Sequence, residues 1–413
     1  MDKQFYDRTF NGRDDWFKLR EDFVRRRKYD SKAEAFEAVG ELLGKLDDPY
    51  TRFLPPDKFD SLVNSATATV AGVGVEILDL GSAAGGVVVG DVQPNSPAEK
   101  AGVMTGDRFK IVDGKDVVAT EMTPEDVAGV LRGPPGSAVG VVFDRAVSGS
   151  SGKGGEREVL DLKLSRATIK IQTVTSRVLP VGQKRIGVIR VKAFSTSSAD
   201  DIKVALKALT AAGGGENSGD GAANSNSNNL DAIALDLRNN AGGLLPGGID
   251  SARLFLPKGS TIVSVTGAKG VTDTSLQDYE ASIALPPTTP LFVLVNRKTA
   301  SAAEVLTAAL GQNGRAVVVG ETTFGKGIVQ NIVRLRDNTG VAVTTSAYLT
   351  PTGKSINKIG ISPDRPLACE PLDSIESCLA GHEDVLAPSA PKVLLPLAGA
   401  AAADAGAAAE ATT

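Results

Sequence analysis

The sequence predicts an α/β protein built from several domains, and three observations lead to this fold class. At 413 residues the chain is longer than one ordinary domain, and its length gives roughly two to four. From Ala167 onward, continuous apolar runs alternate with amphipathic runs, which is typical of a sheet covered on both faces. Before that point a helical pattern is followed by short strand-like runs, so we expect three units in succession.

Residues 1–65 are the first expected unit, a helical region. Between Asp14 and Asp47, apolar residues such as Trp16, Phe23 and Leu43 recur at helical spacing among charged residues. Residues 66–166 are the second unit, which is rich in β-structure. Its expected elements are strands at 86–92, 108–112 and 138–145, a helix at 123–131, and a flexible hairpin loop at 148–155.

Residues 167–384 are the third unit, the α/β core. We expect its strands at 186–191, 232–237, 291–296 and 316–320, and its helices at 199–211, 248–256 and 302–310. Residues 213–229 are almost all Gly, Asn, Ser, Asp or Ala and predict a flexible surface insertion. Residues 385–413 predict a disordered Ala/Pro-rich tail.

Composition narrows the class of function. A net charge of −4 and a pI near 5.4 give no footprint for nucleic acid or an anionic membrane, so we expect neither partner. No apolar run reaches the ~18 residues needed to span a bilayer. The first residues lack the apolar core of a signal peptide, so the chain is either cytosolic or a mature form whose targeting segment has been removed.

Metal and cofactor chemistry find no support in the sequence. The two cysteines, Cys369 and Cys378, either form a disulfide in an oxidising compartment or remain free thiols. Together with the one histidine, His382, they lack the spacing of a structural zinc site. We therefore expect no metal and no cofactor.

Ser301 lies between a predicted buried strand and a predicted helix. The amino end of that helix directs a positive dipole and free N–H groups toward the residue, which suits a nucleophile whose substrate oxygen becomes negative. The alternative is structural, because Ser301 and Glu304 also have the spacing of a capping box.

Lys326 is the candidate base, because the only histidine in the sequence, His382, lies near the C-terminal tail. Glycines flank the lysine on both sides, and the predicted strand before it ends at the same sheet edge as the strand before Ser301. We expect burial beside Phe324 and Val329 to lower its pKa enough to make it a neutral amine; an ordinary solvated lysine is the alternative. Gln330, four residues on, could hold the lysine or the serine in place, and an ordinary strand position is the alternative.

The turn after residues 232–237 could stabilise a negative oxygen. It contains Asn239-Asn240-Ala241-Gly242-Gly243, and such glycine turns expose backbone N–H groups. We expect one arm of an oxyanion hole from this turn and the other from the N–H of Ala302.

The second unit resembles the PDZ family in Asn95-Ser-Pro-Ala-Glu-Lys-Ala-Gly-Val-Met-Thr-Gly-Asp107 and Ile111-Val-Asp-Gly114. Gly72, Val73, Gly74 and Val75 stand where that family's carboxylate-binding loop should be. The resemblance implies that a substrate's C-terminus adds as a strand at a sheet edge. An ordinary small β-rich domain is the alternative.

The chain as a whole resembles the C-terminal processing, or tail-specific, peptidases. Besides the PDZ motifs, the matching pieces are residues 48–54, 236–243, 299–304, 323–330, 348–353 and 360–364, in family order. The resemblance implies a crotonase/ClpP-like α/β protease core with an inserted PDZ domain. It also implies Ser301 as nucleophile, Lys326 as general base, Gln330 as third member, and an oxyanion hole from Gly242, Gly243 and Ala302.

Some expectations depend on finer points of this resemblance. Arg132 matches a family position linked to PDZ-dependent activation, whereas Ala241 and Ala303 depart from the frequent proline and serine. Residues 7–20 look like the photosynthetic branch, which implies the photosystem II reaction-centre subunit precursor as substrate and the thylakoid lumen as location, with the bacterial periplasm as the alternative. We favour a monomer.

Three other functions remain open. The first is a general tail-specific protease of misfolded or tagged proteins, and the second is a non-catalytic PDZ adaptor. The third is a crotonase-like enzyme acting on acyl thioesters, whose α/β core is similar.

Overall fold

The computed structural model describes residues 2, 4–79, 86–146, 157–211, 230–267, 270–276, 285–369 and 374–387, with only the backbone of Ser65 and of 270–276. The predicted insertions at 148–155 and 213–229 lie outside the described residues, as does the tail from 388 onward.

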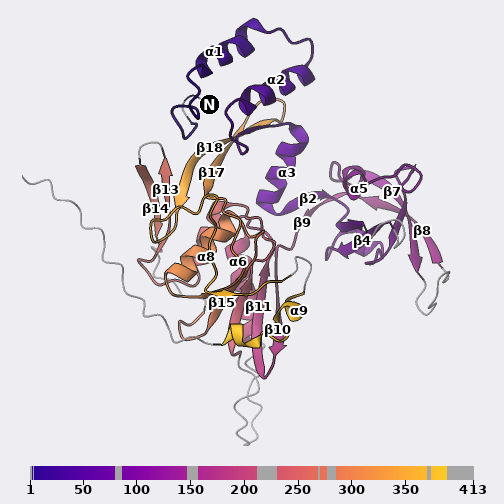
Figure 1. The fold of residues 1–413 in the computed structure, drawn as a ribbon. Helices are drawn as coiled ribbons and strands as arrows, with labels where there is room; N and C mark the ends of the chain where they lie inside the picture. The colour runs from indigo at the N-terminus through magenta and orange to yellow at the C-terminus, as the bar shows by residue number, and fades with distance from the viewer. Residues whose placement is uncertain are drawn as a thin grey trace, which may run out of the picture.

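The N-terminal region is helical, as predicted. It contains α1 (Trp16–Glu21), a π-helical turn (Asp22–Arg26), α2 (Lys32–Gly44), β1 (Arg52–Leu54) and α3 (Pro56–Thr67). The rings of Phe10 and Trp16 stack at 5.3 Å in a small core that also contains Leu46 and Val343. Strand β1 pairs antiparallel with β18 (Gly340–Leu349), and this pairing docks the region on the rest of the molecule (Figure 1).

The second unit is a six-stranded sheet, in which five strands follow the order β3-β4-β5-β7-β8 and the short β6 (Lys115–Asp116) pairs with β5. The five strands are β3 (Val75–Asp79), β4 (Val87–Val92), β5 (Arg108–Val112), β7 (Ala138–Ala146) and β8 (Arg157–Ser165). Helices α4 (Pro97–Lys100) and α5 (Pro124–Leu131) accompany the sheet, and Phe109 and Phe143 meet in the unit's own core.

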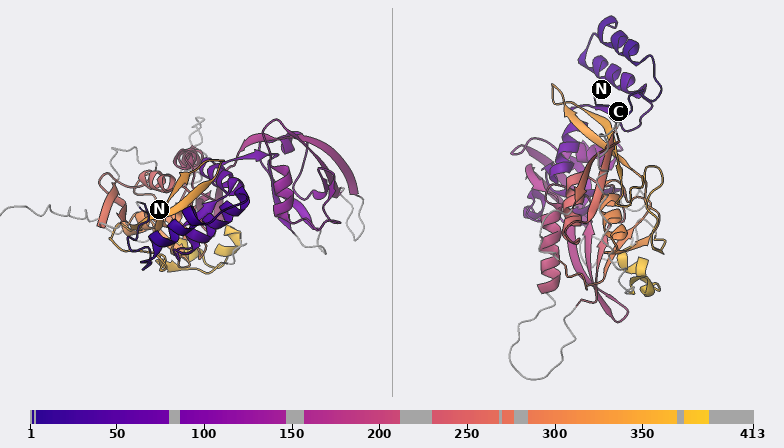
Figure 2. Two further views of the ribbon diagram at one scale, coloured as in Figure 1. Left: turned by 90° about the horizontal axis from the view of Figure 1, so that it is seen from above. Right: turned by 90° about the vertical axis from the view of Figure 1, so that its left-hand side faces the viewer.

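The second unit is joined to the remainder by a two-stranded ribbon, β2 (Thr69–Gly72) with β9 (Ala167–Lys170). The views in Figure 1 and in the left panel of Figure 2 show the second unit standing to one side of the core. The unit therefore has a hydrophobic core of its own. Two chain segments, one entering the unit and one leaving it, connect it to the rest of the molecule.

The core is built on a six-stranded sheet in the order β10-β11-β12-β15-β16-β19, parallel except for the β10–β11 pair. Its strands are β10 (Val174–Val181), β11 (Lys184–Val191), β12 (Ala232–Asp236), β15 (Leu291–Val295), β16 (Val317–Gly320) and β19 (Arg365–Pro366). The central strands are buried along their whole length, which explains their continuous apolar sequences.

Both faces of this sheet are covered, as predicted. The apolar side chains of α6 (Ser198–Ala211), α7 (Leu245–Arg253) and α8 (Ala302–Gln312) pack on one face. The opposite face is covered by the C-terminal segment, with α9 (Ile375–Leu379) and a 3-10 turn (Glu383–Leu386).

This C-terminal segment corrects one expectation and answers an open question. Val385 and Leu386, which we assigned to the disordered tail, are buried in the core, Leu386 completely (0% exposed). Cys369 and Cys378 form a disulfide, with Cα atoms 5.3 Å apart. Apolar residues at the start of the predicted tail thus complete the second face of the sheet.

A second, smaller sheet stands at the end of the core that faces the N-terminal region (Figure 1). Its strands follow the order β1-β18-β13-β14, with β17 (Ile328–Arg334) also paired to β18. Strands β13 (Thr261–Gly267) and β14 (Gly270–Leu276) form a hairpin. The sequence analysis placed no strand at β18, although this strand links the N-terminal region to the core.

Candidate active site

Ser301 lies where the predicted strand-to-helix turn places it, directly before α8. Its backbone adopts φ 57° and ψ −122°, a region that residues with a side chain rarely occupy. Such a conformation persists only where the surroundings enforce it, and it occurs most often at functional sites.

The turn after β12 lies against Ser301. A Cβ atom added to Gly242 (φ 102°) would fall 2.7 Å from the Cβ of Ser301 and 2.8 Å from the carbonyl oxygen of Ala300. A Cβ on Gly243 (φ 132°) would fall 2.1 Å from the carbonyl oxygen of Phe194. Both glycines are therefore needed for the close approach of the backbone segments.

Buried polar groups hold this turn. Asp236 forms ion pairs with Arg238 and Arg190, at 2.9 and 2.8 Å. Asn240 is completely buried, and its Nδ2 donates to the carbonyl oxygen of Val191 at 2.9 Å. The backbone carbonyl oxygen of Asn240 accepts from Ala300 N–H at 2.9 Å. The turn is thus fixed both to the sheet and to the residue before Ser301.

The structure changes the expected role of Gly242. Its N–H donates to Oδ1 of Asn240 at 2.8 Å, so this group is already engaged. Gly242 makes room beside Ser301, and its N–H is bonded to Asn240 in this conformation. Ala302, the first residue of α8, has an N–H that cannot bond within its own helix, and Gly243 is the other predicted donor in the turn.

Glu304 connects the segment of Ser301 to the segment of Lys326. Its carboxylate is completely buried, and Oε2 accepts from Ser301 N–H at 2.8 Å and from Lys326 N–H at 2.9 Å. Oε1 accepts from Gly325 N–H at 2.7 Å and from the Thr323 hydroxyl at 2.5 Å. The sequence analysis expected Glu304 only as the capping partner of Ser301; its contact with Lys326 was not foreseen.

Lys326 is half-buried, but its surroundings differ from the expected ones. Phe324 points outward and is 57% exposed, so it does not bury the lysine. The Nζ atom lies 5.3 Å from the ring centroid of Tyr50, in the segment before β1. Burial lowers the pKa of Lys326, and the positive charge of Arg52 lowers it further.

Gln330 lies on β17, half-buried, and its amide faces the same N-terminal segment. Its Nε2 donates to the carbonyl oxygen of Tyr50 at 2.6 Å. Tyr50 therefore contacts Gln330 through its backbone and Lys326 through its ring. Residues 48–54 match a motif of the family, but nothing in their sequence predicted a part in the site.

Tyr348, near the end of β18, is a second residue that the sequence analysis missed. Its hydroxyl lies within hydrogen-bonding distance of two carbonyl oxygens, that of Ser301 at 3.2 Å and that of Lys326. Burial raises the pKa of Tyr348 well above its ordinary value, and the charges of Glu304 and Tyr50 act in the same direction.

The predicted peptide-binding residues lie in the second unit. Gly72 ends β2, Val73 is buried, Gly74 has φ 89°, and Val75 begins β3. Strand β3 is an edge strand, and α5 packs beside it. Arg132 is exposed at the carboxyl end of α5, which Figure 1 shows well apart from α8.

The described residues contain no helix that is both long and apolar enough to pass through a bilayer. Within the same part of the chain, no cluster of three or more His, Cys, Asp or Glu side chains could hold a metal ion.

Comparison with known proteins agrees with this architecture. A family model for peptidase family S41 matches residues 185–367, and a PDZ domain model matches residues 88–145. The chain is 36% identical over 382 residues to the C-terminal processing peptidase, chloroplastic, of Tetradesmus obliquus, covering 90% of this chain and 76% of the relative. It is also 36% identical over 373 residues to a carboxyl-terminal-processing protease of Picosynechococcus sp., covering 90% and 82%.

Solved structures agree as well. A structure named photosystem II D1 C-terminal processing protease matches with a TM-score of 0.53 and 36% identity over 90% of both chains. An S41 protease structure from Bacteroides fragilis matches with a TM-score of 0.52 at 16% identity, covering 89% of this chain and 88% of that one, and supports the fold alone. The predicted fold class is confirmed, and the chain belongs to peptidase family S41, as a serine peptidase of the C-terminal processing type that carries a PDZ domain.

Proposed function

We propose that this chain is an endopeptidase that removes a C-terminal extension with Ser301 as nucleophile and Lys326 as general base. The observation that carries the assignment is the shared carboxylate of Glu304, which accepts from the backbone N–H groups of both residues. Segments distant in sequence are thereby held side by side at the amino end of α8.

The chemistry follows from the groups at hand. The neutral Lys326 amine takes the proton of the Ser301 hydroxyl as Oγ bonds to the scissile carbonyl carbon. The N–H groups of Gly243 and Ala302 stabilise the oxyanion, while Gly242 leaves the space that the approach requires. The protonated lysine gives its proton to the leaving amine as the C–N bond breaks, which leaves an acyl ester on Ser301.

Deacylation uses the same groups. Lys326 takes a proton from a water molecule that attacks the ester, and it returns that proton to Ser301 Oγ as the new C-terminus leaves. Gln330, held by the Tyr50 carbonyl, limits the positions open to the lysine side chain.

The PDZ unit selects the substrate in this proposal. An extended, apolar C-terminus adds along the free edge of β3 beside α5, and the loop from Gly72 to Val75 receives its carboxylate on backbone N–H groups. Arg132, exposed at the end of α5, is the residue that we propose couples this occupancy to activation.

We further propose the photosystem II reaction-centre subunit precursor as substrate and the thylakoid lumen as location. The support is the similarity to chloroplastic processing peptidases and to the structure named for the D1 protein. A general tail-specific protease of misfolded or tagged proteins is the alternative function, and the bacterial periplasm is the alternative location; the similarity to carboxyl-terminal-processing proteases of bacteria supports only a bacterial origin.

The catalytic assignment is tested with a protein that bears an exposed apolar C-terminal extension. We expect the wild type to trim it, and Ser301→Ala and Lys326→Ala to lower kcat by roughly 10³-fold or more while keeping the wild-type fold. If the wild type binds the tail without cutting it, the chain is an adaptor and Ser301 is only a helix cap. Hydrolysis of a coenzyme A thioester in place of peptides would instead favour the crotonase-like alternative.

Recognition through the PDZ unit has a separate test. The same substrate is prepared with its terminal carboxylate capped as an amide, which removes the charge that the loop would bind. We expect a loss of turnover that raising the substrate concentration partly restores. Equal turnover of the free and capped substrates would refute PDZ recognition and leave the catalytic assignment intact.

A further inference from the structure

Tyr348 contributes a buried hydroxyl to the junction between the nucleophile and base segments. The side chain is 2% exposed and comes from β18, outside the core sheet. Its oxygen reaches the carbonyls of both Ser301 and Lys326, and its raised pKa keeps the phenol protonated at neutral pH. A phenol has a single proton, so it is shared between the two carbonyls or alternates between them.

Tyr348 and Glu304 act on complementary backbone groups. Glu304 accepts from the N–H groups of Ser301 and Lys326, and Tyr348 donates toward their carbonyl groups. The two residues therefore fix the peptide units on both sides of each catalytic Cα atom. Three separate elements meet at this point: helix α8, strand β18, and the loop that follows β16.

We propose that Tyr348 is a positioning residue, whose hydroxyl holds Ser301 and Lys326 at reacting distance. This inference rests on the proposed Ser/Lys chemistry. Loss of the hydroxyl leaves the ring packed in the core, so substrate binding is kept while the two catalytic segments gain freedom. The effect belongs to the chemical step, because a misplacement of about 1 Å can cost ~10²-fold in rate.

The test compares Tyr348→Phe with Tyr29→Phe. Tyr29 is a matched control, because its hydroxyl also donates to a backbone carbonyl, that of Phe23 at 2.7 Å, in the N-terminal region. We expect Tyr348→Phe to lower kcat by about 10-fold or more with KM within about threefold, and to slow single-turnover acylation equally. Tyr29→Phe should leave both constants within about twofold.

The possible results separate the two proposals. A wild-type kcat in Tyr348→Phe overturns the positioning role even if Ser301→Ala is inactive. A fall in kcat that only tracks the unfolded fraction, measured by urea denaturation, overturns it as well. If Ser301→Ala itself keeps wild-type activity, the catalytic assignment fails first.

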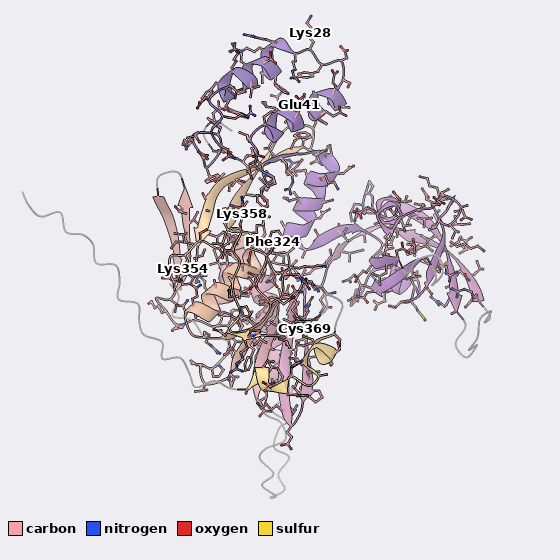
Figure 3. The ribbon with its side chains drawn as sticks, in the orientation of Figure 1. Lys28, Glu41, Phe324, Lys354, Lys358 and Cys369 are labelled. Atoms are coloured by element: carbon pink, nitrogen blue, oxygen red, sulfur yellow. A yellow bond between two sulfur atoms is a disulfide. The ribbon has the colours of Figure 1, made fainter. Side chains whose placement is uncertain are left out.

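A second, independent observation concerns two exposed apolar side chains beside Lys326. Phe324 is 57% exposed and Ile359 is 70% exposed, although both belong to well-anchored loops. Phe324 N–H donates to the carbonyl of Thr299 at 2.9 Å, and the carbonyl of the next residue, Gly325, accepts from Lys358 N–H, the residue before Ile359, at 2.8 Å. Figure 3 shows Phe324 and the neighbouring Lys358 close together at the upper end of the core.

We infer that Phe324 and Ile359 form a subsite for an apolar side chain of the substrate next to the scissile bond. Exposed apolar side chains that gather at one place on the surface can mark a binding site. Phe324 precedes the proposed base by two residues, and its partner Thr299 precedes the proposed nucleophile by two. The occupant is therefore the polypeptide being cleaved, and this inference too rests on the proposed chemistry.

This subsite is tested with peptide pairs that differ by Leu or Ser at each position flanking the scissile bond. We expect the wild type to prefer Leu at one position by about 10-fold or more in kcat/KM, and Phe324→Ser to reduce that ratio to about two. Val204→Ser removes an equally exposed apolar residue (66%) on α6 and should leave the ratio unchanged. The subsite is refuted if Phe324→Ser slows both peptides equally, which would instead indicate a docking contact for the PDZ unit. Cleavage that survives Ser301→Ala would refute the chemistry itself.

Discussion

At the scale of single residues, the protonation of Lys326 governs the proposed activity. The N-terminal segment contributes to it directly, because the Tyr50 ring faces Nζ and the Arg52 charge lowers the pKa of Lys326 in addition to burial. The buried carboxylate of Glu304 and the phenol of Tyr348 lie on the other side, against the lysine's backbone. Besides burial, a cation from a different unit of the chain thus lowers the pKa of the proposed base.

The pH dependence of kcat/KM should show the effect of Arg52 on the pKa of Lys326. Activity should rise with pH through the pKa of Lys326, because only the neutral amine accepts the serine proton. Arg52→Gln removes a repelling charge, so the pKa of Lys326 should rise and the acid limb of the profile should move to higher pH. Arg52→Lys should keep the wild-type profile.

Lys28→Gln provides the control for net charge. Lys28 is exposed at the far end of the N-terminal region, well away from Phe324 (Figure 3). The pH profile of kcat/KM for Lys28→Gln should match that of the wild type. Superimposable profiles for Arg52→Gln and Lys28→Gln would show that Arg52 does not act on the base.

At the scale of elements, the strand-to-helix turn of Ser301 depends on the glycine turn after β12. The helix at 302–310 was predicted from its apolar pattern, and α8 begins at that residue. The close contact of Gly242 with Ser301 could not be predicted, because a glycine pair after a strand is an ordinary turn signal. Long-range packing decides what such a turn touches.

Gly242→Ala should inactivate the protein, and Gly259→Ala should not. Both glycines have positive φ, so each substitution costs about 1 kcal/mol or more of stability in backbone strain. Only at Gly242 does the new methyl group meet the Cβ of Ser301, whereas nothing lies within 4 Å at Gly259. We expect kcat to fall by roughly 10²-fold or more in Gly242→Ala.

Urea unfolding and kinetics of the two variants check this together. Gly242→Ala should lose more unfolding free energy than Gly259→Ala, because its methyl group also meets the backbone of Ala300. In the absence of urea both variants should be folded, and only Gly242→Ala should lose kcat. Equal activity in both would mean that the turn can withdraw from Ser301 without consequence.

At the scale of the whole molecule, the C-terminal segment stabilises the core by covering its second face. The disulfide between Cys369 and Cys378 fixes this segment, and Figure 3 places Cys369 toward the end of the core away from Phe324. A loop of this length corresponds to about 2–3 kcal/mol of stabilisation in the chain-entropy view.

A reductant should therefore lower the unfolding free energy of the core by about 2–3 kcal/mol. Activity at 25 °C should be kept, because the disulfide lies away from the proposed catalytic residues. The double variant Cys369→Ala/Cys378→Ala, which has no bond to reduce, should show no response to reductant. A response of the double variant would trace the effect to something other than the disulfide.

The sequence by itself determined the class of fold, the order of the units and the candidate groups. Apolar periodicity depends on local burial, so it identified the central strands, α6 and α8; the motifs around Ser301 and Lys326 are contiguous in sequence. The tertiary structure alone placed Tyr348, Tyr50 and Arg52 at the site, engaged the N–H of Gly242 with Asn240, and exposed Phe324. These contacts join residues far apart along the chain, and which of them form depends on how the sheets pack rather than on any local pattern.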